Sequence, residues 1–257
     1  MADPLEDLKD KARAHVWDRL AAAAAVHDPD VHGRIPNFIS AGAAADRLAE
    51  LPVWKSAHVI KTVPDKAQRA VRARALRDGK LVYMAVPKLA RERPFCLLDP
   101  AQLEVPPEQA ADSHRAIALA PTVDVDEVRP VDLVVCGSVA VNRRGVHLGK
   151  GAGYSDLEVA LLREAGRIGP ETVIATTVHA LQVVDEDLPE SDHDFSVDLI
   201  VTPEQVIECG PRRRPAGLMW ERLPAEKIAA IPVLRRRASD RRSRPAGPGD
   251  GHRPGHG

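Results

Sequence analysis

The chain has 257 residues, a length that suits one large domain or one domain with a tail. Apolar residues make up 44% of it and aromatic residues only 3%, so Val, Leu, Ile and Ala must build the core of a globular protein. Lysine plus arginine number 36 and aspartate plus glutamate 37, and the resulting net charge of −1 argues against a dominant attraction to nucleic acid or membrane.

The cysteines and the first residues bear on the compartment. Cys96, Cys136 and Cys209 lie far apart and form no CxxC pair, which argues against a zinc ribbon or a redox motif and favours a reducing environment. The acidic N-terminus lacks the apolar run of a signal peptide, and no stretch approaches about 18 uninterrupted apolar residues. We therefore expect a cytoplasmic protein without a transmembrane helix.

Helices and strands alternate along the first half of the chain. Residues 5–25 predict a helix in which Lys9, Arg13 and Trp17 recur every four positions and share one face. The patterns that follow predict a helix at 41–51, a strand at 57–63, a basic helix at 66–78 ended by Gly79, and a strand at 80–86. The proline-rich stretch 88–115 predicts loops with short elements.

The second half continues the alternation. The almost wholly apolar run 132–141 predicts one strand that is covered on both faces. A helix is predicted at about 155–166, where Ser155 and Glu158 have the spacing of a capping box. Further strands are predicted at 172–179 and 197–202.

This order of elements predicts the fold class and the domain limits. Alternating strands and helices favour a three-layer α/β/α domain with a mostly parallel sheet, here over residues 1–234. Residues 235–257 are rich in arginine, glycine and proline and contain nothing that builds a core. They predict a disordered basic tail.

The densest chemical motif is the stretch Gly145–Gly153, called the glycine loop below. Its four glycines let backbone N–H groups turn toward one point, and a predicted helix N-terminus follows, so both features favour a bound phosphate. Lys150 would add a positive charge. The loop contains neither a Walker A motif nor a GxGxxG motif with an acid about 20 residues later. A flexible surface turn is the alternative interpretation.

Two other segments carry charges that could act with the glycine loop. Residues 188–194, the acidic loop, precede a buried strand, and ligands of open parallel sheets bind beyond the strand ends. Asp194 could reach Mg²⁺ there, since Mg²⁺ on a nucleotide takes one or two carboxylates plus phosphate oxygens. Lys9 and Arg13 could meet the outer phosphates. Taken alone, each segment is more readily interpreted as solvated surface.

In order and spacing, these motifs resemble the 5-formyltetrahydrofolate cyclo-ligase family over about residues 5–208. The matching positions are Lys9, Arg13, Gly79-Lys80, His147–Asp156, His193-Asp194, Asp198 and Thr202. The methenyltetrahydrofolate synthase domain-containing branch is similar at further positions, which are Trp17-Asp18, Arg34–Phe38, Pro215–Trp220 and Ile231–Arg235.

The resemblance implies a fold like the NagB/RpiA/CoA-transferase group and a ring closure that uses ATP and Mg²⁺. ATP phosphorylates the formyl oxygen of 5-formyltetrahydrofolate, N10 attacks the activated carbon, and phosphate leaves as 5,10-methenyltetrahydrofolate forms. Lys150 and Arg13 would be catalytic, and Asp156 and Asp194 would hold Mg²⁺. The nucleotide would contact Lys9, Arg13, Gly149, Lys150, Gly151, Ala152, Gly153, Tyr154 and Ser155.

Some positions depart from the family pattern. His147 stands where the family has a loop arginine, and Ser155 stands where it has a second tyrosine associated with folate packing. Ala152 and Leu157 replace residues that are often basic. Residues 67–70 lack the glutamate that the family places about a dozen residues before Gly-Lys and that is expected to bind the pterin.

These departures keep other functions open. One alternative is a nucleotide-binding relative that acts on another small acyl or formyl compound. Another is a protein that associates with RNA through Arg212–Arg214 and the basic tail. In each case we expect a monomer, and under the resemblance its small-molecule partner is a reduced folate.

Overall fold

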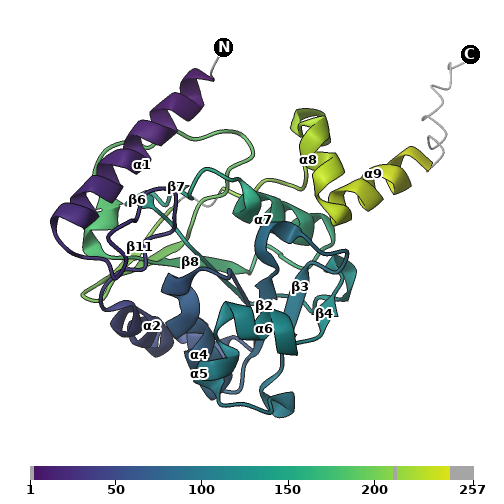
Figure 1. The fold of residues 1–257 in the computed structure, drawn as a ribbon, viewed down its shortest axis with the longest axis horizontal. Helices are drawn as coiled ribbons and strands as arrows, with labels where there is room; N and C mark the ends of the chain where they lie inside the picture. Colours follow the sequence, from purple (N-terminus) through teal and green to yellow (C-terminus); the bar gives the residue numbers. More distant parts are fainter. Residues whose placement is uncertain (1–2, 211–212, 244–257) are drawn as a thin grey trace, which may run out of the picture.

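A mostly parallel sheet of eight strands runs through the centre of the protein, as a computed structural model covering residues 3–210 and 213–243 describes it (Figure 1). The strand order is β11-β10-β8-β5-β1-β2-β3-β4. The five inner strands from β10 to β2 pair in parallel, and β11, β3 and β4 add antiparallel pairs at the edges. The bounds are β1 Val59–Thr62, β2 Leu81–Ala85, β3 Phe95–Leu98, β4 Thr122–Val123, β5 Leu133–Cys136, β8 Val173–Thr177, β10 Leu199–Val201 and β11 Val206–Glu208.

Helices cover both faces of this sheet. The α-helices are α1 Pro4–Ala22, α2 Ala41–Glu50, α3 Pro52–Ser56, α4 Arg69–Arg77, α5 Pro107–Ala110, α6 Ser113–Leu119, α7 Tyr154–Glu164, α8 Ala225–Ala230 and α9 Pro232–Ser243. Helices α2 to α6 pack on one face around Leu48, Trp54 and Leu76, and α7 and α9 pack on the other around Leu161 and Leu234 (Figure 1). The predicted three-layer α/β/α fold with a mostly parallel sheet is confirmed.

The apolar run at 132–141 forms two strands, so the prediction of one strand is wrong. β5 ends at Cys136 in the main sheet, and β6 (Ala140–Asn142) joins a small second sheet with β7 (His147–Leu148) and β9 (Val183–Val184). Between β5 and β6 the side chain of Gln182 donates to the carbonyl oxygens of Ser138 and Val139, at 2.7 and 3.2 Å. The chain thus leaves the main sheet at the carboxyl end of β5, and the glycine loop begins only after β6.

Helix α1 packs against the second sheet, outside the three layers. Val16, Trp17 and Leu20 on α1 share an apolar cluster with Ala140 on β6 and Leu148 on β7. The indole of Trp17 also donates to the carbonyl oxygen of Arg34 at 3.0 Å. This packing points the Trp17 face of the helix inward, which agrees with the predicted common face.

The predicted capping box at the start of α7 is wrong. The N-cap is Gly153, in the left-handed conformation, and no side chain caps the helix. Glu158 is instead buried and pairs with Lys61 on the central strand β1. A buried ammonium group competes successfully for this carboxylate because an unpaired charge in the core would be costly.

The disorder predicted from residue 235 onward is wrong for residues 235–243, which belong to α9. Val233, Leu234 and Ala238 anchor this helix in the core. Its arginines bind carboxylates of the domain, through the pairs Arg235–Glu92, Arg236–Asp124 and Arg237–Asp126. Residues 244–257 of the predicted tail lie outside the described residues.

The state of the cysteines and the character of the helices bear on the expectations about redox state and membrane crossing. Cys96, Cys136 and Cys209 are all free thiols. Within residues 3–210 and 213–243, no helix has both the length and the apolar character needed to cross a membrane.

Candidate functional site

A cavity of about 460 Å³ opens beyond the carboxyl end of the sheet, between α1, the glycine loop and the acidic loop. This volume lies in the range of small-molecule sites. Every site residue predicted from the sequence lines the cavity, namely Lys9, Arg13, Gly149, Lys150, Gly151, Ala152, Gly153, Tyr154, Ser155, Asp156 and Asp194. The structure therefore brings α1, the glycine loop and the acidic loop together at one cavity, although they are far apart in the sequence.

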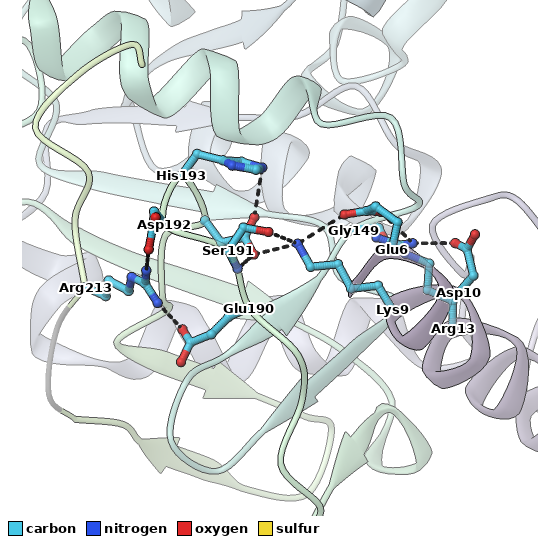
Figure 2. Close-up of polar contacts among 11 residues, drawn as sticks. Glu6, Lys9, Asp10, Arg13, Gly149, Glu190, Ser191, Asp192, His193 and Arg213 are labelled. Carbon is cyan, nitrogen blue, oxygen red and sulfur yellow. Dashed lines mark hydrogen bonds and ion pairs between the residues drawn. The ribbon is translucent and has the colours of Figure 1, made fainter. Parts of the chain in front are cut away.

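Lys9 connects α1 to the acidic loop. Its Nζ donates to Ser191 Oγ at 2.8 Å (Figure 2). It also donates to Asp194 Oδ2 at 2.7 Å. The backbone N–H of Ser191 donates to the same carboxylate oxygen at 2.6 Å. Lys9 is only 3% exposed, so its charge acts where little water screens it.

Arg13, one turn further along α1, supports the glycine loop. Its Nε donates to the carbonyl oxygen of Gly149 at 2.9 Å, and its Nη1 lies 2.5 Å from Asp10 Oδ1 (Figure 2). Gly151, at φ +92°, passes so close that a Cβ there would lie 3.4 Å from Arg13 Nη1. The guanidinium group is therefore in direct contact with the loop backbone at the cavity.

The glycine loop ends at an uncapped helix terminus. Because no side chain caps α7, the first N–H groups of this helix keep their capacity to bind an anion. Gly145, at the start of the loop, has φ +88°, and a Cβ there would lie 2.2 Å from the carbonyl oxygen of Val197. Only glycine allows this close approach to the Val197 backbone, which fixes the position of the first residue of the glycine loop.

Asp156 and Asp194 provide two carboxylates at the cavity. Asp156 lies in the first turn of α7, and burial raises its pKa to about 7; the nearby charge of Asp194 adds to this shift and Lys9 opposes it. Two neighbouring carboxylates, one of them poorly hydrated, fit the donors that Mg²⁺ takes beside phosphate oxygens. No group of three or more His, Cys, Asp or Glu residues in the described part of the chain could hold a metal ion unaided. A bound cation would thus need ligand oxygens as well.

Asp65 is a site residue that the sequence reasoning missed. It follows β1 and accepts a hydrogen bond from Lys150 Nζ at 3.1 Å. Asp65, Lys150 and Ile35 also line a second cavity of about 240 Å³ that adjoins the first. Residues 67–70 indeed lack an acid, but Asp65 places one at the site. Its position directly after a buried parallel strand is the signal that could have revealed it.

His147 occupies the position of the family's loop arginine as a buried, neutral side chain. Its Nδ1 lies 3.2 Å from Ser138 Oγ, which lies 2.8 Å from Thr176 Oγ1, and its ring packs on Phe195 at 4.6 Å between centroids. Burial lowers the pKa of His147 to about 4. The cavity therefore lacks a permanent charge at this position.

Comparison with known proteins gives consistent results. The sequence profile of the 5-formyltetrahydrofolate cyclo-ligase family matches residues 7–203. The methenyltetrahydrofolate synthase domain-containing protein of Mus musculus is 38% identical over 239 residues, which cover 88% of this chain and 62% of that protein. Its Homo sapiens counterpart is 36% identical over 238 residues, covering 88% and 60%. The chain thus spans less than two thirds of these relatives.

A solved structure shares the fold. The NMR structure of Aquifex aeolicus 5,10-methenyltetrahydrofolate synthetase superposes with a TM-score of 0.51 and 22% identity, covering 80% of this chain and 95% of that one. At this identity the likeness concerns the fold alone. The α/β architecture around the cavity is therefore one that occurs in a known synthetase.

Proposed function

The chain belongs to the 5-formyltetrahydrofolate cyclo-ligase family, and we propose that it closes 5-formyltetrahydrofolate to 5,10-methenyltetrahydrofolate with ATP and Mg²⁺. One observation carries this proposal: α1, the glycine loop and the acidic loop bring their predicted phosphate- and Mg²⁺-binding side chains to a single cavity. A generic surface turn would not need buried cations from a helix more than 130 residues away, such as Arg13 at Gly149.

Charge neutralisation is the main task of the protein in this reaction. A phosphoryl group moves from ATP to the formyl oxygen, and its charge must be stabilised while it moves. Arg13 donates to the Gly149 carbonyl oxygen, Lys150 follows Gly149 in the loop, and both line the cavity and would face this group. Lys9 and the uncapped N–H groups of α7 would hold the other phosphate oxygens.

Asp156 and Asp194 would hold Mg²⁺ together with phosphate oxygens, and the bound ion would supply further positive charge. Asp194 is kept in place by Lys9 and by the N–H of Ser191. Asp156 is fixed by the first turn of α7. Both carboxylates are thus positioned by the folded chain, which favours a defined position for the outer phosphates.

Asp65 would bind the folate. It lies where the cavity of about 460 Å³ adjoins the smaller one of about 240 Å³. Its carboxylate can accept hydrogen bonds from the N–H groups of a pterin ring. Its partner Lys150 would then lie between the folate and the nucleotide. This arrangement suits a reaction in which a phosphoryl group passes from one substrate to the other.

A second candidate is a relative that phosphorylates another small acyl or formyl compound. It is favoured by the neutral His147 and by Ser155, which remove a charge and an aromatic ring from the cavity wall. Association with RNA has less support. Arg213 forms ion pairs with Glu190 and Asp192, so it is already engaged within the protein.

Binding titrations separate these candidates. Purified protein should bind ATP with Mg²⁺, and 5-formyltetrahydrofolate should bind more tightly when a non-hydrolysable ATP analogue and Mg²⁺ are present. Nucleotide binding without any folate binding would favour the second candidate. If the folded protein bound neither ligand, both candidates would be wrong.

A further inference from the structure

The cavity has a wall that lies outside the family's matched region. Residues 213–231, called the C-terminal segment here, follow the match to residues 7–203. They nevertheless line the cavity with Leu218, Met219, Leu223 and Lys227. This part of the cavity wall therefore lies outside the matched family region, in a segment where the chain resembles the methenyltetrahydrofolate synthase domain-containing branch.

Lys227, on α8 (Ala225–Ala230), connects this wall to the glycine loop. Its Nζ donates to the carbonyl oxygen of Ala152 at 3.1 Å and lies 5.6 Å from the ring centroid of Tyr154. A Cβ on Gly153 would lie 3.0 Å from the same Nζ. The ammonium group thus occupies space that Gly153 leaves free, next to the uncapped start of α7.

No carboxylate of residues 3–210 and 213–243 forms an ion pair with Lys227. Four other lysine and arginine side chains at the cavity each hold a carboxylate, in the pairs Lys9–Asp194, Arg13–Asp10, Lys150–Asp65 and Arg222–Asp192. Within the part of the chain that the structure describes, Lys227 contacts only a carbonyl oxygen and an aromatic ring. An anionic ligand could thus reach Lys227 without breaking an ion pair.

We propose that Lys227 is a further phosphate-binding residue of this site, added by the C-terminal segment. The inference rests on the proposed nucleotide binding at the glycine loop. A phosphate held by the loop amides would lie beside the Ala152 carbonyl to which Lys227 donates. Exchanging this neutral acceptor for a phosphate oxygen gives a stronger hydrogen bond, because both the donor and the acceptor are then charged.

A structural role predicts different behaviour. If Lys227 only holds α8 against the loop, removing its charge should disturb the cavity wall and lower the affinity for every ligand of the site. If it binds phosphate, only the nucleotide should be affected. The variant Lys227→Met tests this, because it removes the charge and keeps an apolar stem against Tyr154.

The experiment measures the Kd of ATP with Mg²⁺ and of 5-formyltetrahydrofolate for each full-length variant, together with thermal unfolding without ligand. We expect Lys227→Met to weaken the binding of ATP about tenfold or more. Lys227→Arg should restore most of the affinity. Lys55→Gln, a change of an exposed lysine outside the cavity, should match the wild type. Folate affinity and the unfolding temperature should stay the same in all variants.

Several results would overturn the inference. Equal ATP affinity of Lys227→Met and the wild type would do so, and so would a loss confined to the folate. A joint loss of both affinities with a lower unfolding temperature would assign Lys227 a structural role instead; if Lys227→Met were poorly folded, Lys227→Gln would replace it. In each of these cases the wild type still binds ATP and the proposed function stands. A wild type that binds no ATP would overturn both.

Discussion

The ammonium group of Lys9 lies 2.7 Å from the carboxylate of Asp194, although 185 positions separate the two residues in the chain. The pair closes one side of the cavity and holds α1 against the acidic loop. It also places a positive charge beside Asp194 and Asp156, the two carboxylates proposed to bind Mg²⁺. The pair thus joins the folding of α1 to the charge balance of the site.

Removing the Lys9 charge should cost stability. Lys9→Met leaves the partly buried Asp194 without its counter-charge, so the free energy of unfolding should fall by about 3 kcal/mol. The double variant Lys9→Met/Asp194→Asn should recover part of this loss. Urea unfolding without Mg²⁺ measures both. Lys11→Met, on the exposed side of α1, is the control; equal stability of Lys9→Met and this control would contradict the prediction.

Two glycines of the glycine loop should respond differently to alanine. Gly145→Ala would press a Cβ against the Val197 carbonyl and force alanine to φ +88°, so we expect a loss of about 2 kcal/mol or more. A Cβ on Gly149 meets no atom within 4 Å, so Gly149→Ala should keep the stability of the wild type. The measurement is the thermal unfolding temperature of each variant. Similar unfolding temperatures for Gly145→Ala and Gly149→Ala would contradict the close approach at Gly145.

His147 should make the protein sensitive to acid. Its pKa is about 4 in the folded state against an ordinary value of 6.5, so between these pH values the unfolded chain binds the extra proton. The stability that His147 contributes is therefore complete above pH 6.5 and falls by up to about 3 kcal/mol as the pH drops to 4. The contribution of Asp156 to stability changes in the opposite direction with pH. Because its pKa is raised in the folded state, the folded protein binds the extra proton and gains stability as the pH falls.

The two contributions can be separated by variants. His147→Gln should lose less stability on acidification than the wild type, and Asp156→Asn should lose more. Urea unfolding at a series of pH values from 7.5 to about 4.5 measures both differences. If the three proteins had parallel pH profiles, neither buried group would have the shifted pKa described above.

Asp65→Asn should distinguish the folate from the nucleotide. The change removes the carboxylate at the border of the two cavities and releases Lys150. We expect 5-formyltetrahydrofolate to bind about tenfold more weakly, because charged hydrogen bonds are lost, while ATP affinity changes little. Asp99→Asn, outside both cavities, is the matched control. An unchanged folate affinity would rule out the role proposed for Asp65.

Local spacing indicated separate parts of the candidate site, and the family resemblance indicated that these parts act together. Lys9, Arg13 and Trp17 share a helical face by spacing alone, and the buried position of Trp17 then turns both cations inward. The glycine loop was predicted beside a helix N-terminus because glycine spacing and strand–helix order are local properties. The assembly of these parts into one cavity was expected from the family resemblance, because α1 packs outside the three layers and the order of the main sheet does not place it.

Tertiary contacts decided what the sequence did not reveal. Residues 132–141 are equally apolar on both sides of Gly137, so nothing local indicates that β5 and β6 enter different sheets. Glu158 has capping-box spacing, but its partner Lys61 is 97 positions away. Lys227 belongs to a six-residue helix without a motif, and only the folded chain places it on the glycine loop.

The most direct test of the proposed function is the formation of product. Full-length protein with 5-formyltetrahydrofolate, ATP and Mg²⁺ should produce the absorbance band of 5,10-methenyltetrahydrofolate, with one phosphate released for each molecule formed. The band should be absent without ATP, and much weaker with Arg13→Met, whose guanidinium contacts the glycine loop. Folded wild-type protein that binds ATP and Mg²⁺ but forms no methenyl product would contradict the cyclo-ligase function.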